Sequence, residues 1–369
     1  MAGPAAPGAG PAAGRRHSVF HPLRVAAIER LTDDAVALTF DVPPRLREAF
    51  AYRAGQHVSV RAPQLRDGAR RNYSICAPAT SGVLRIGVKR IPGGVFSSFA
   101  AEQLRPGDVL DVMTPTGSFT AELDPARARC YAAIAAGSGI TPVLSILATA
   151  LEVEPASSAV LIYVNRTTQS IMFAEELEDL KNRYPERFQL VHVLDAEPLD
   201  TEIVSGRLDA QRLGRILDAL VPADVDDWFL CGPLPMTDAA RDVLIGRGTD
   251  PGRVHRELFF VGPPPGPAPR PVGEAAAGSA VTIVLDGRSQ TFTLPPDGEP
   301  ILEAALRVRS DAPFACKNGV CGTCRAKLTD GEVRLDANYA LEPGELAAGF
   351  VLTCQAHPVT DHVTVDYDQ

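Results

Sequence analysis

Hydrophobic and polar positions alternate with a period of two over the first third of the chain. Val36, Leu38 and Phe40 alternate with smaller or more polar residues, and the same pattern returns at 84–88. Because neighbouring side chains of a strand point to opposite faces, this pattern predicts strands that each bury one face. Residues 18–124 are therefore expected to form an antiparallel β-barrel.

The rhythm changes after the barrel. Short apolar runs at 130–135, 159–164, 188–193 and 227–230 alternate with helical stretches at 141–151, 173–183 and 234–245. Strands that alternate with helices predict a parallel sheet. Residues 125–260 are therefore expected to form an α/β, Rossmann-like domain.

Two segments lack the pattern of a folded element. The low-complexity residues 1–17 are expected to form a disordered tail. Residues 261–279 are rich in proline and contain no aromatic residue, so they predict an exposed linker. A third domain is expected from 280 to 369.

Composition narrows the function classes. The 369 residues are 45% hydrophobic and 22% charged, as in globular proteins of more than one domain. No apolar run approaches the length of a membrane helix, and the N-terminal stretch lacks the apolar segment of a signal peptide, so a cytoplasmic protein without membrane contact is expected. The net charge of −9 and the absence of a Lys/Arg block argue against a nucleic-acid partner. Residues 280–369, with 13 acidic and 7 basic side chains, are the acidic part.

Four of the seven cysteines are clustered near the C-terminus: Cys316, Cys321, Cys324 and Cys354. Their C-x4-C-x2-C…C spacing is that of plant-type [2Fe-2S] ferredoxins. Small residues between them, Gly319, Gly322 and Thr323, would let the backbone wrap closely round a cluster. A structural zinc site is the alternative, although zinc ribbons favour two C-x2-C pairs. A Rieske centre would need histidine ligands, and we interpret His357 and His362 as surface residues.

A glycine loop is predicted where the first strand of the α/β domain meets its helix, at Gly137-Ser138-Gly139-Ile140-Thr141-Pro142. Such a loop brings backbone amides close to a pyrophosphate, although it can also be a plain tight turn. Cys231-Gly232-Pro233 ends a later strand of the same sheet, where ligand contacts are expected. Asn165-Arg166 follows the second strand without an acid, and an arginine there can pair with the 2′-phosphate of NADPH. Arg166 could equally be a solvated loop residue, and NADH stays possible.

Two segments of the barrel carry the chemistry of a flavin site. Arg71-Asn72-Tyr73-Ser74 offers a cation for a phosphate, an aromatic face for a ring and a hydroxyl for a ring nitrogen. Gly94-Val95-Phe96-Ser97 begins a helix that can contact a second phosphate. Each segment alone is more often an ordinary strand or turn.

The order of these motifs resembles the ferredoxin-NADP reductase family, and the added ferredoxin domain resembles that of oxygenase reductases. A narrower resemblance, over about His17 to Gln369, is to the reductase subunits of phenylacetyl-CoA epoxidases. It rests on segments such as Ala54-Gly55-Gln56-His57, Asn338-Tyr339-Ala340-Leu341 and the C-terminal Val365-Asp366-Tyr367-Asp368-Gln369. The N-terminal tail lies outside this resemblance, and the proline-rich linker is longer than it implies. The resemblance implies an α+β, β-grasp fold for the third domain.

The resemblance also implies roles for single residues. Arg71 would meet the flavin pyrophosphate, Tyr73 would pack on the isoalloxazine and Ser74 would lie near N5. The other implied flavin residues are Asn72, Val88, Lys89, Arg90 and the turn 94–97. On the nucleotide side it implies the loop 137–142 with Cys231, Gly232, Pro233 and Met236. Ser74, Tyr73, Cys231 and Glu257 are the predicted catalytic residues, and Phe259 would lie near the flavin ring unless it is a hydrophobic end-cap.

The implied activity is electron transfer from NADPH through FAD and a [2Fe-2S] cluster to the di-iron oxygenase of a phenylacetyl-CoA epoxidase. A flavin is needed because a hydride carries two electrons and the cluster accepts one at a time. FMN could replace FAD. The alternatives are an NADH-dependent reductase of a Rieske or steroid-ring oxygenase and a non-catalytic zinc-binding or redox-sensing protein.

Overall fold

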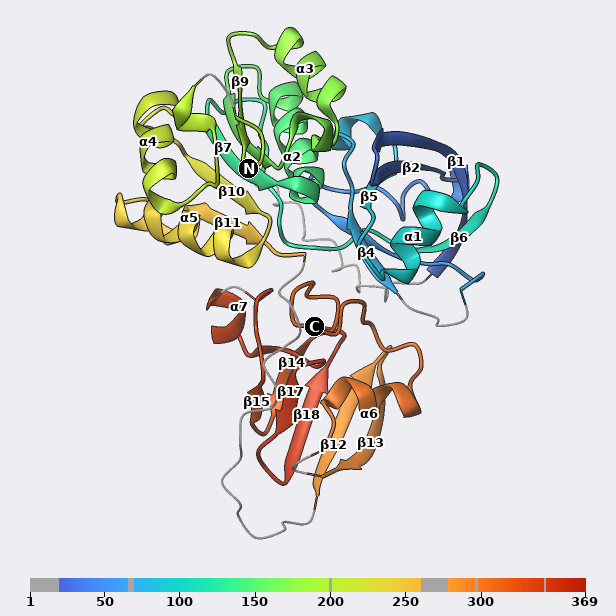
Figure 1. The fold of residues 1–369 in the computed structure, drawn as a ribbon. Helices are drawn as coiled ribbons and strands as arrows, with labels where there is room; N and C mark the ends of the chain where they lie inside the picture. The colour runs from blue at the N-terminus through green and yellow to red at the C-terminus, as the bar shows by residue number, and fades with distance from the viewer. Residues whose placement is uncertain (1–19, 66–69, 199–200, 260–277, 296–297, 342) are drawn as a thin grey trace, which may run out of the picture.

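The computed structural model describes residues 20–65, 70–198, 201–259, 278–295, 298–341 and 343–369. The predicted tail, 1–17, lies outside the described residues, as does the predicted linker, 261–279, up to residue 277. Figure 1 shows two domains beside each other and a third beneath them. The three-part fold class predicted from the sequence is confirmed.

Six antiparallel strands build the first domain: β1 (Phe20–Thr32), β2 (Ala35–Asp41), β3 (His57–Arg61), β4 (Arg71–Ser74), β5 (Arg85–Lys89) and β6 (Val109–Met113). Their order is β4-β3-β6-β1-β2-β5. An isolated bridge between Ile75 and Ile86 joins the two edge strands, so the sheet closes into the predicted barrel. Helix α1 (Val95–Glu102) and the 3-10 turns η1 (Pro44–Leu46) and η2 (Ala79–Ser81) complete it.

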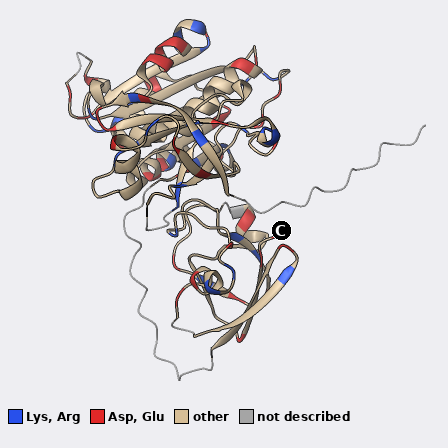
Figure 2. Ribbon diagram, turned by 90° about the vertical axis from the view of Figure 1, so that its right-hand side faces the viewer, with Lys and Arg blue, Asp and Glu red and all other residues tan. Residues whose placement is uncertain are grey.

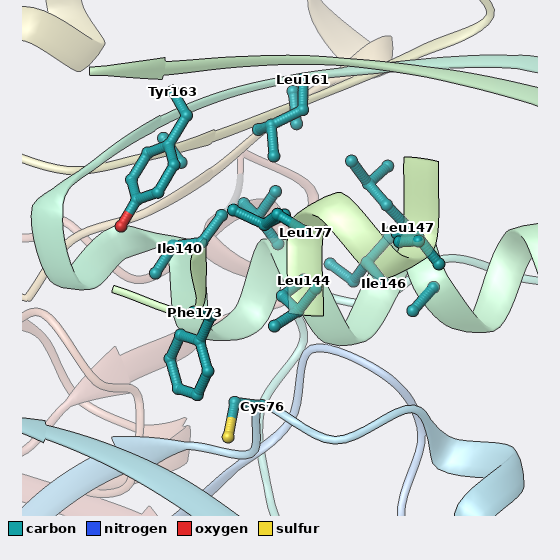
Figure 3. Packing of buried hydrophobic residues seen from close by; sticks show 14 of the residues in the cluster. Cys76, Ile140, Leu144, Ile146, Leu147, Leu161, Tyr163, Phe173 and Leu177 are labelled. Carbon is teal, nitrogen blue, oxygen red and sulfur yellow. The ribbon is translucent and has the colours of Figure 1, made fainter. Parts of the chain in front are cut away.

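Strand β2 is buried on both faces, which its alternating sequence does not indicate. Val36, Leu38 and Phe40 point into the barrel core as predicted. Ala35 and Ala37, on the other face, are also buried, because they pack into the cluster that joins the barrel to the second domain. Figure 3 shows this cluster around helix α2, with Cys76 of the barrel beneath Phe173.

The second domain is a parallel sheet of β7 (Cys130–Ala136), β8 (Ser158–Asn165), β9 (Phe188–Leu194), β10 (Asp227–Cys231) and β11 (Val254–Glu257). Its helices are α2 (Ile140–Val153), α3 (Ala174–Arg183), α4 (Ala210–Leu220) and α5 (Leu234–Gly246), with the 3-10 turns η3 (Gly137–Gly139), η4 (Thr168–Ser170), η5 (Glu202–Val204) and η6 (Pro251–Arg253). Each predicted strand and helix of this region is confirmed within three residues at its ends. Helices α2 and α3 bury one face of the sheet, and α4 and α5 bury the other.

The sheet has the strand order β11-β10-β7-β8-β9. From β7 the chain first adds strands on one side, β8 and β9, and then returns to add β10 and β11 on the other side. In open parallel sheets, ligands bind at such a switch point, beyond the carboxyl ends of the strands. The glycine loop follows β7 and Cys-Gly-Pro follows β10, so the topology brings both predicted nucleotide motifs to one crevice.

The third domain has the mixed sheet of a β-grasp fold. Strands β12 (Ser279–Leu285), β13 (Arg288–Leu294), β14 (Arg325–Asp330), β16 (Phe350–Leu352) and β18 (His362–Asp366) follow the order β13-β12-β18-β14-β16. Helix α6 (Ile301–Val308) packs into the core of this sheet. A small pair, β15 (Val333–Leu335) with β17 (Ala356–Pro358), and helix α7 (Pro343–Ala347) complete the domain. Within the described ranges of the chain, no helix is both long enough and apolar enough to cross a bilayer.

Candidate functional site

Ser74, at the end of β4, connects the barrel to the nucleotide domain. Its hydroxyl donates a hydrogen bond to Oε2 of Glu257 across 3.1 Å. Glu257 ends β11, where the parallel register places it beside Cys231 of β10. Burial raises the pKa of Glu257 to about 8, against a smaller lowering by the Ser74 hydroxyl. The carboxyl is therefore mostly protonated at neutral pH.

His57 completes this group and was missed by the sequence analysis as a site residue. It is the cross-strand partner of Ser74 in the β3–β4 pair, and its Nδ1 lies 3.9 Å from Oε1 of Glu257. Burial lowers the pKa of His57 to about 4, so the two side chains face each other as neutral groups at pH 7. Its Nε2 is buried and has no hydrogen-bond partner among the described residues. The signal that could have found it is the antiparallel register opposite the R-x-Y-S motif.

The other predicted flavin residues lie next to this group. The Tyr73 ring lies 5.4 Å from that of Phe96, which is the second residue of helix α1, and burial raises the pKa of the Tyr73 hydroxyl. Arg71 is exposed and donates to the backbone oxygen of Arg70. A Cβ on Gly94 would lie 2.5 Å from Oγ of Ser97 and 3.0 Å from the carbonyl oxygen of Ile91, so the start of α1 is tightly packed there. The two barrel motifs are therefore brought together, as a shared ligand requires.

The side chains of the predicted flavin strand 88–90 contact other residues of the barrel. Val88 is fully buried in the barrel core. Lys89 pairs with Asp34 at 3.4 Å, and Arg90 donates to Glu102 at 2.9 Å. A contact between this strand and a flavin would run through the backbone, so the predicted side-chain roles stay predictions.

The glycine loop packs against the Cys-Gly-Pro segment backbone to backbone. A Cβ on Gly139 would lie 2.2 Å from the carbonyl oxygen of Cys231, and Gly137 has a φ of +51°. A Cβ on Gly232 would lie 2.7 Å from Cε of Met236. Glycine at these positions allows the loop and the Cys-Gly-Pro segment to approach each other closely, as a loop that cradles a pyrophosphate is expected to do. Pro233 is the N-cap of α5, and Pro142 lies in the first turn of α2.

Hydroxyl groups hold the loop in place. Oγ1 of Thr141 donates to the carbonyl oxygen of Ser138 at 3.0 Å, and the Tyr163 hydroxyl donates to that of Gly137, also at 3.0 Å. Ile140 is fully buried beneath them. The Cys231 thiol is also buried, and burial, with the nearby Glu257, raises its pKa, so it is a thiol and not a thiolate at neutral pH.

An acid from the segment after β9 lies against the loop after β8, and the sequence analysis did not foresee it. Asn165 is buried at the strand end, and Arg166 is exposed, which fits both a ligand contact and a solvated loop residue. Glu197, which follows β9, accepts hydrogen bonds from N and Oγ1 of Thr168, at 2.7 and 3.0 Å. A positive and a negative side chain therefore lie at the place where a 2′-phosphate was predicted. Phe259, at the end of the described nucleotide domain, keeps 38% of its surface exposed.

The four clustered cysteines are arranged as two pairs. A hydrogen bond from the Cys321 thiol, supported by backbone amides, lowers the pKa of Cys316 to about 6. In the same way Cys324 lowers the pKa of Cys354. The Asn318 amide donates to Cys316 Sγ at 3.4 Å, and Nε2 of Gln355 to Cys354 Sγ at 3.7 Å. Two thiol pairs with amide donors match the ligands of a two-iron cluster, two per iron.

The cysteine loop requires unusual backbone angles. Gly319 and Gly322 have φ of +73° and +65°, so the prediction that small residues allow the close turn agrees with the backbone. No three Cys, His, Asp or Glu side chains of the described part of the chain gather as ligands of one metal ion.

One sequence interpretation of this domain is wrong. His362 is exposed as predicted, but His357 is buried, with Nε2 2.8 Å from Oδ2 of Asp336. The reason is the pairing of β17 with β15, which places His357 opposite Arg334. All three residues of β17 are buried.

The cysteine loop faces the strand that carries the flavin motif. Nδ2 of Asn72 donates to Oγ1 of Thr323, between Cys321 and Cys324, across 3.3 Å. A cavity of about 420 Å³ opens beside this contact, and its lining includes His57, Glu257 and Cys321. Figure 1 shows β4 on the side of the barrel that faces the third domain. Residues of all three domains therefore meet in one region.

Comparisons with known families agree with this arrangement. The family described as "Oxidoreductase FAD-binding domain" matches residues 22–121, "Oxidoreductase NAD-binding domain" matches 133–242 and "2Fe-2S iron-sulfur cluster binding domain" matches 283–359. The glycine turns at 94 and 137–139 and the paired thiols all lie within the residues that these three families match.

Two curated relatives cover nearly the whole chain. A subunit of the 1,2-phenylacetyl-CoA epoxidase of Escherichia coli K12 is 45% identical over 95% of this chain and 98% of its own length. The ferredoxin reductase component of 3-ketosteroid-9-alpha-monooxygenase from Rhodococcus rhodochrous is 35% identical over 94% and 96%. The solved structure of phthalate dioxygenase reductase has the same fold, with a TM-score of 0.57 at 24% identity over 94% of this chain and 98% of that one. The chain belongs to the ferredoxin-NADP reductase superfamily, in the group of oxygenase reductases with a C-terminal [2Fe-2S] domain.

Proposed function

We propose that this protein passes electrons from NADPH, through FAD and a [2Fe-2S] cluster, to the di-iron oxygenase of phenylacetyl-CoA epoxidase. The 45% identity with a protein of such an epoxidase supports this acceptor. The observation that carries the electron route is the hydrogen bond from Asn72 to Thr323. It joins the strand of the flavin motif to the loop of the cluster ligands, and so gives a short path between the two groups.

The residues assigned to the route follow the motifs. A bound flavin would take up the two electrons of a hydride together and release them singly. Arg71, Asn72, Tyr73, the strand 88–90 and the turn 94–97 would hold it, with Phe259 near its ring. The loop 137–142, Asn165, Arg166, Cys231, Gly232, Pro233 and Met236 would hold the dinucleotide. Cys316, Cys321, Cys324 and Cys354 would bind the cluster.

Ser74, Glu257 and His57 would form an uncharged, proton-holding group beside the ring that accepts the hydride. The Ser74 hydroxyl lies between the flavin motif and the Glu257 carboxyl, which carries a proton at neutral pH. His57 stays neutral and adds no charge to the site. The assigned role of this group is to keep the site uncharged while the ring gains negative charge, and any proton that Glu257 gave up through Ser74 would have to be returned from solvent to restore that neutrality.

The choice of NADPH rests on Arg166. An exposed guanidinium at the end of β8 can pair with a 2′-phosphate, whereas the ribose of NADH needs a hydrogen-bond acceptor. Glu197, which accepts a hydrogen bond from the Thr168 amide, would repel a phosphate there. Arg166 is the exposed cation of this pair of opposite charges, and for this reason we assign the protein to NADPH.

The acceptor is expected to dock on the acidic third domain, in which 13 acidic side chains oppose 7 basic ones. A complementary basic patch on the oxygenase would make the association sensitive to salt. Acidic and basic segments are interspersed over the domains (Figure 2). The cytoplasm is the expected compartment, because all seven cysteines lie in the described part of the chain and none of them forms a disulfide there.

Stopped-flow reduction tests this function. The protein, reduced anaerobically with NADPH, is mixed with the oxygenase component of a phenylacetyl-CoA epoxidase, and reduction of its di-iron centre is followed. Rapid reduction supports the proposal. Failure with this oxygenase, together with efficient reduction of a Rieske oxygenase, would refute it.

An NADH-dependent reductase for a Rieske or steroid-ring oxygenase is the second candidate. It is favoured by the 35% identity with a 3-ketosteroid monooxygenase reductase and by Glu197 in the predicted 2′-phosphate site. Comparing flavin reduction by NADH and NADPH separates the candidates, since Glu197 would favour the unphosphorylated ribose.

A further inference from the structure

Arg70, which directly precedes β4, lies between the barrel and the cysteine loop. Its guanidinium carbon is 4.0 Å from the ring centre of Phe314, in the third domain, and 5.0 Å from that of Phe20, in the barrel. Its NH1 also donates to the backbone oxygen of Phe314 at 3.4 Å. A cation over an aromatic face is an attractive contact that becomes stronger as water is excluded.

The surroundings of Arg70 indicate a built contact. Burial, with the neighbouring cation of Arg61, lowers the pKa of Arg70 to about 10, so it is partly desolvated but still charged at neutral pH. Arg61 lies over the other ring, Phe20, at 4.4 Å, and pairs with Asp111 at 2.8 Å. Phe314 packs against the core of the third domain. Both rings are therefore fixed on their own domains, and Arg70 spans them.

The second contact between the same two segments is oriented by a buried serine. The Ser59 hydroxyl donates to Oδ1 of Asn72 at 2.6 Å, which turns Nδ2 outward to Thr323. Ser59 is almost fully buried. Residues 70 and 72 thus contact residues 314 and 323, which lie in the sequence on either side of the proposed ligands Cys316 and Cys321. We call these two contacts the clasp.

We propose that Arg70, stacked on Phe314, is a positioning residue that holds the cluster loop against the flavin strand for electron transfer within the chain. Its contacts with Phe20 and Phe314 lie outside the residues assigned to the dinucleotide. This inference rests on the proposed function. Loss of the clasp should slow electron transfer to the cluster and leave the rate of the preceding hydride step unchanged.

The variants are Arg70→Gln, Arg70→Lys and Phe314→Leu, with Arg30→Ala as a matched control, since Arg30 is an exposed barrel arginine that bonds only to Asp33 in the described chain. Anaerobic stopped-flow with excess NADPH follows the flavin and cluster bands separately. We expect flavin reduction within about twofold of the parent and cluster reduction slowed about tenfold in Arg70→Gln and Phe314→Leu. Arg70→Lys should lie between, because an ammonium keeps the charge but not the planar stack. The double variant Arg70→Gln/Phe314→Leu should reduce the cluster no more slowly than either single variant, because both changes remove the same contact.

A second measurement does not depend on activity. Small-angle X-ray scattering should give a larger radius of gyration for Arg70→Gln than for the parent and Arg30→Ala proteins, because the third domain would leave the barrel. Unchanged cluster reduction with an unchanged radius, or equal slowing of both bands, overturns the clasp. If NADPH reduces neither group in the parent protein, the proposed function fails, and the scattering comparison alone decides the clasp.

Discussion

The hydroxyl of Ser74 donates a hydrogen bond to the carboxyl of Glu257 across 3.1 Å, and so links two domains at the predicted flavin site. The bond joins the R-x-Y-S motif of the barrel to the last residue of the nucleotide sheet. Burial raises the pKa of this carboxyl to about 8. A proton-holding group is therefore placed where hydride transfer is proposed to occur.

We expect the rate of flavin reduction by NADPH to fall as the pH rises through about 8. Ionisation of Glu257 would place a negative charge beside a ring that gains negative charge, which opposes the transfer. Glu257→Gln stays neutral and should give a profile without this step. Stopped-flow rates between pH 6 and pH 10 would measure it, and the same step in the glutamine variant would rule out Glu257 as its source.

The same carboxyl should make the stability of the protein depend on pH. Its pKa is raised from 4.5 to about 8 on folding, so its stabilising contribution is complete below pH 4.5 and is lost as the pH rises to 8. Between pH 5 and pH 8 the free energy of unfolding should fall in the parent, relative to Glu257→Gln, by about 2 kcal/mol or more. Urea unfolding at both pH values measures this difference, and equal changes in the two proteins would contradict it.

Gly139→Ala should damage the nucleotide domain. Its Cβ would meet the Cys231 carbonyl oxygen at 2.2 Å, and this neighbour is backbone that cannot rotate away. We expect a loss of about 2–4 kcal/mol of stability and weak NADPH binding. Gly246→Ala is the control, because no described atom lies within 4 Å of its Cβ. Thermal unfolding and dinucleotide titration compare the two, and equal stability would refute the contact.

Arg166→Ala should raise the KM for NADPH about tenfold or more and leave that for NADH nearly unchanged, because only the phosphate needs the guanidinium. Glu197→Gln should act in the opposite direction for NADPH, since it removes a negative charge near Thr168. Steady-state kinetics with both dinucleotides provide the test. Equal effects on the two dinucleotides would show that Arg166 does not read the phosphate.

Cys321→Ser and Cys324→Ser should each abolish the visible absorption of the cluster, because each removes one member of a thiol pair. Cys130→Ser is the control, since Cys130 is a cysteine of the nucleotide domain. Iron and sulfide analysis of the purified proteins checks the result, and a full cluster in either variant would remove that residue from the ligand set.

The sequence predicts the site motifs better than their contacts. Arg71-Asn72-Tyr73-Ser74 and the cysteine spacing are local patterns, and parallel strand order alone brings the glycine loop to Cys231. His57, Glu197 and Arg70 were missed because their roles come from register and domain packing, which join distant segments. His357 was misjudged for the same reason, since the strand that pairs with it, β15, comes from an earlier part of the chain.

One chain is proposed to carry electrons from NADPH to a flavin and on to a cluster. An anaerobic NADPH titration followed by visible absorbance tests this most directly. We predict uptake of about three electrons per chain, two by the flavin and one by the cluster, with bleaching of both bands. A colourless protein, or bleaching of the flavin band while the cluster stays oxidised, would contradict it.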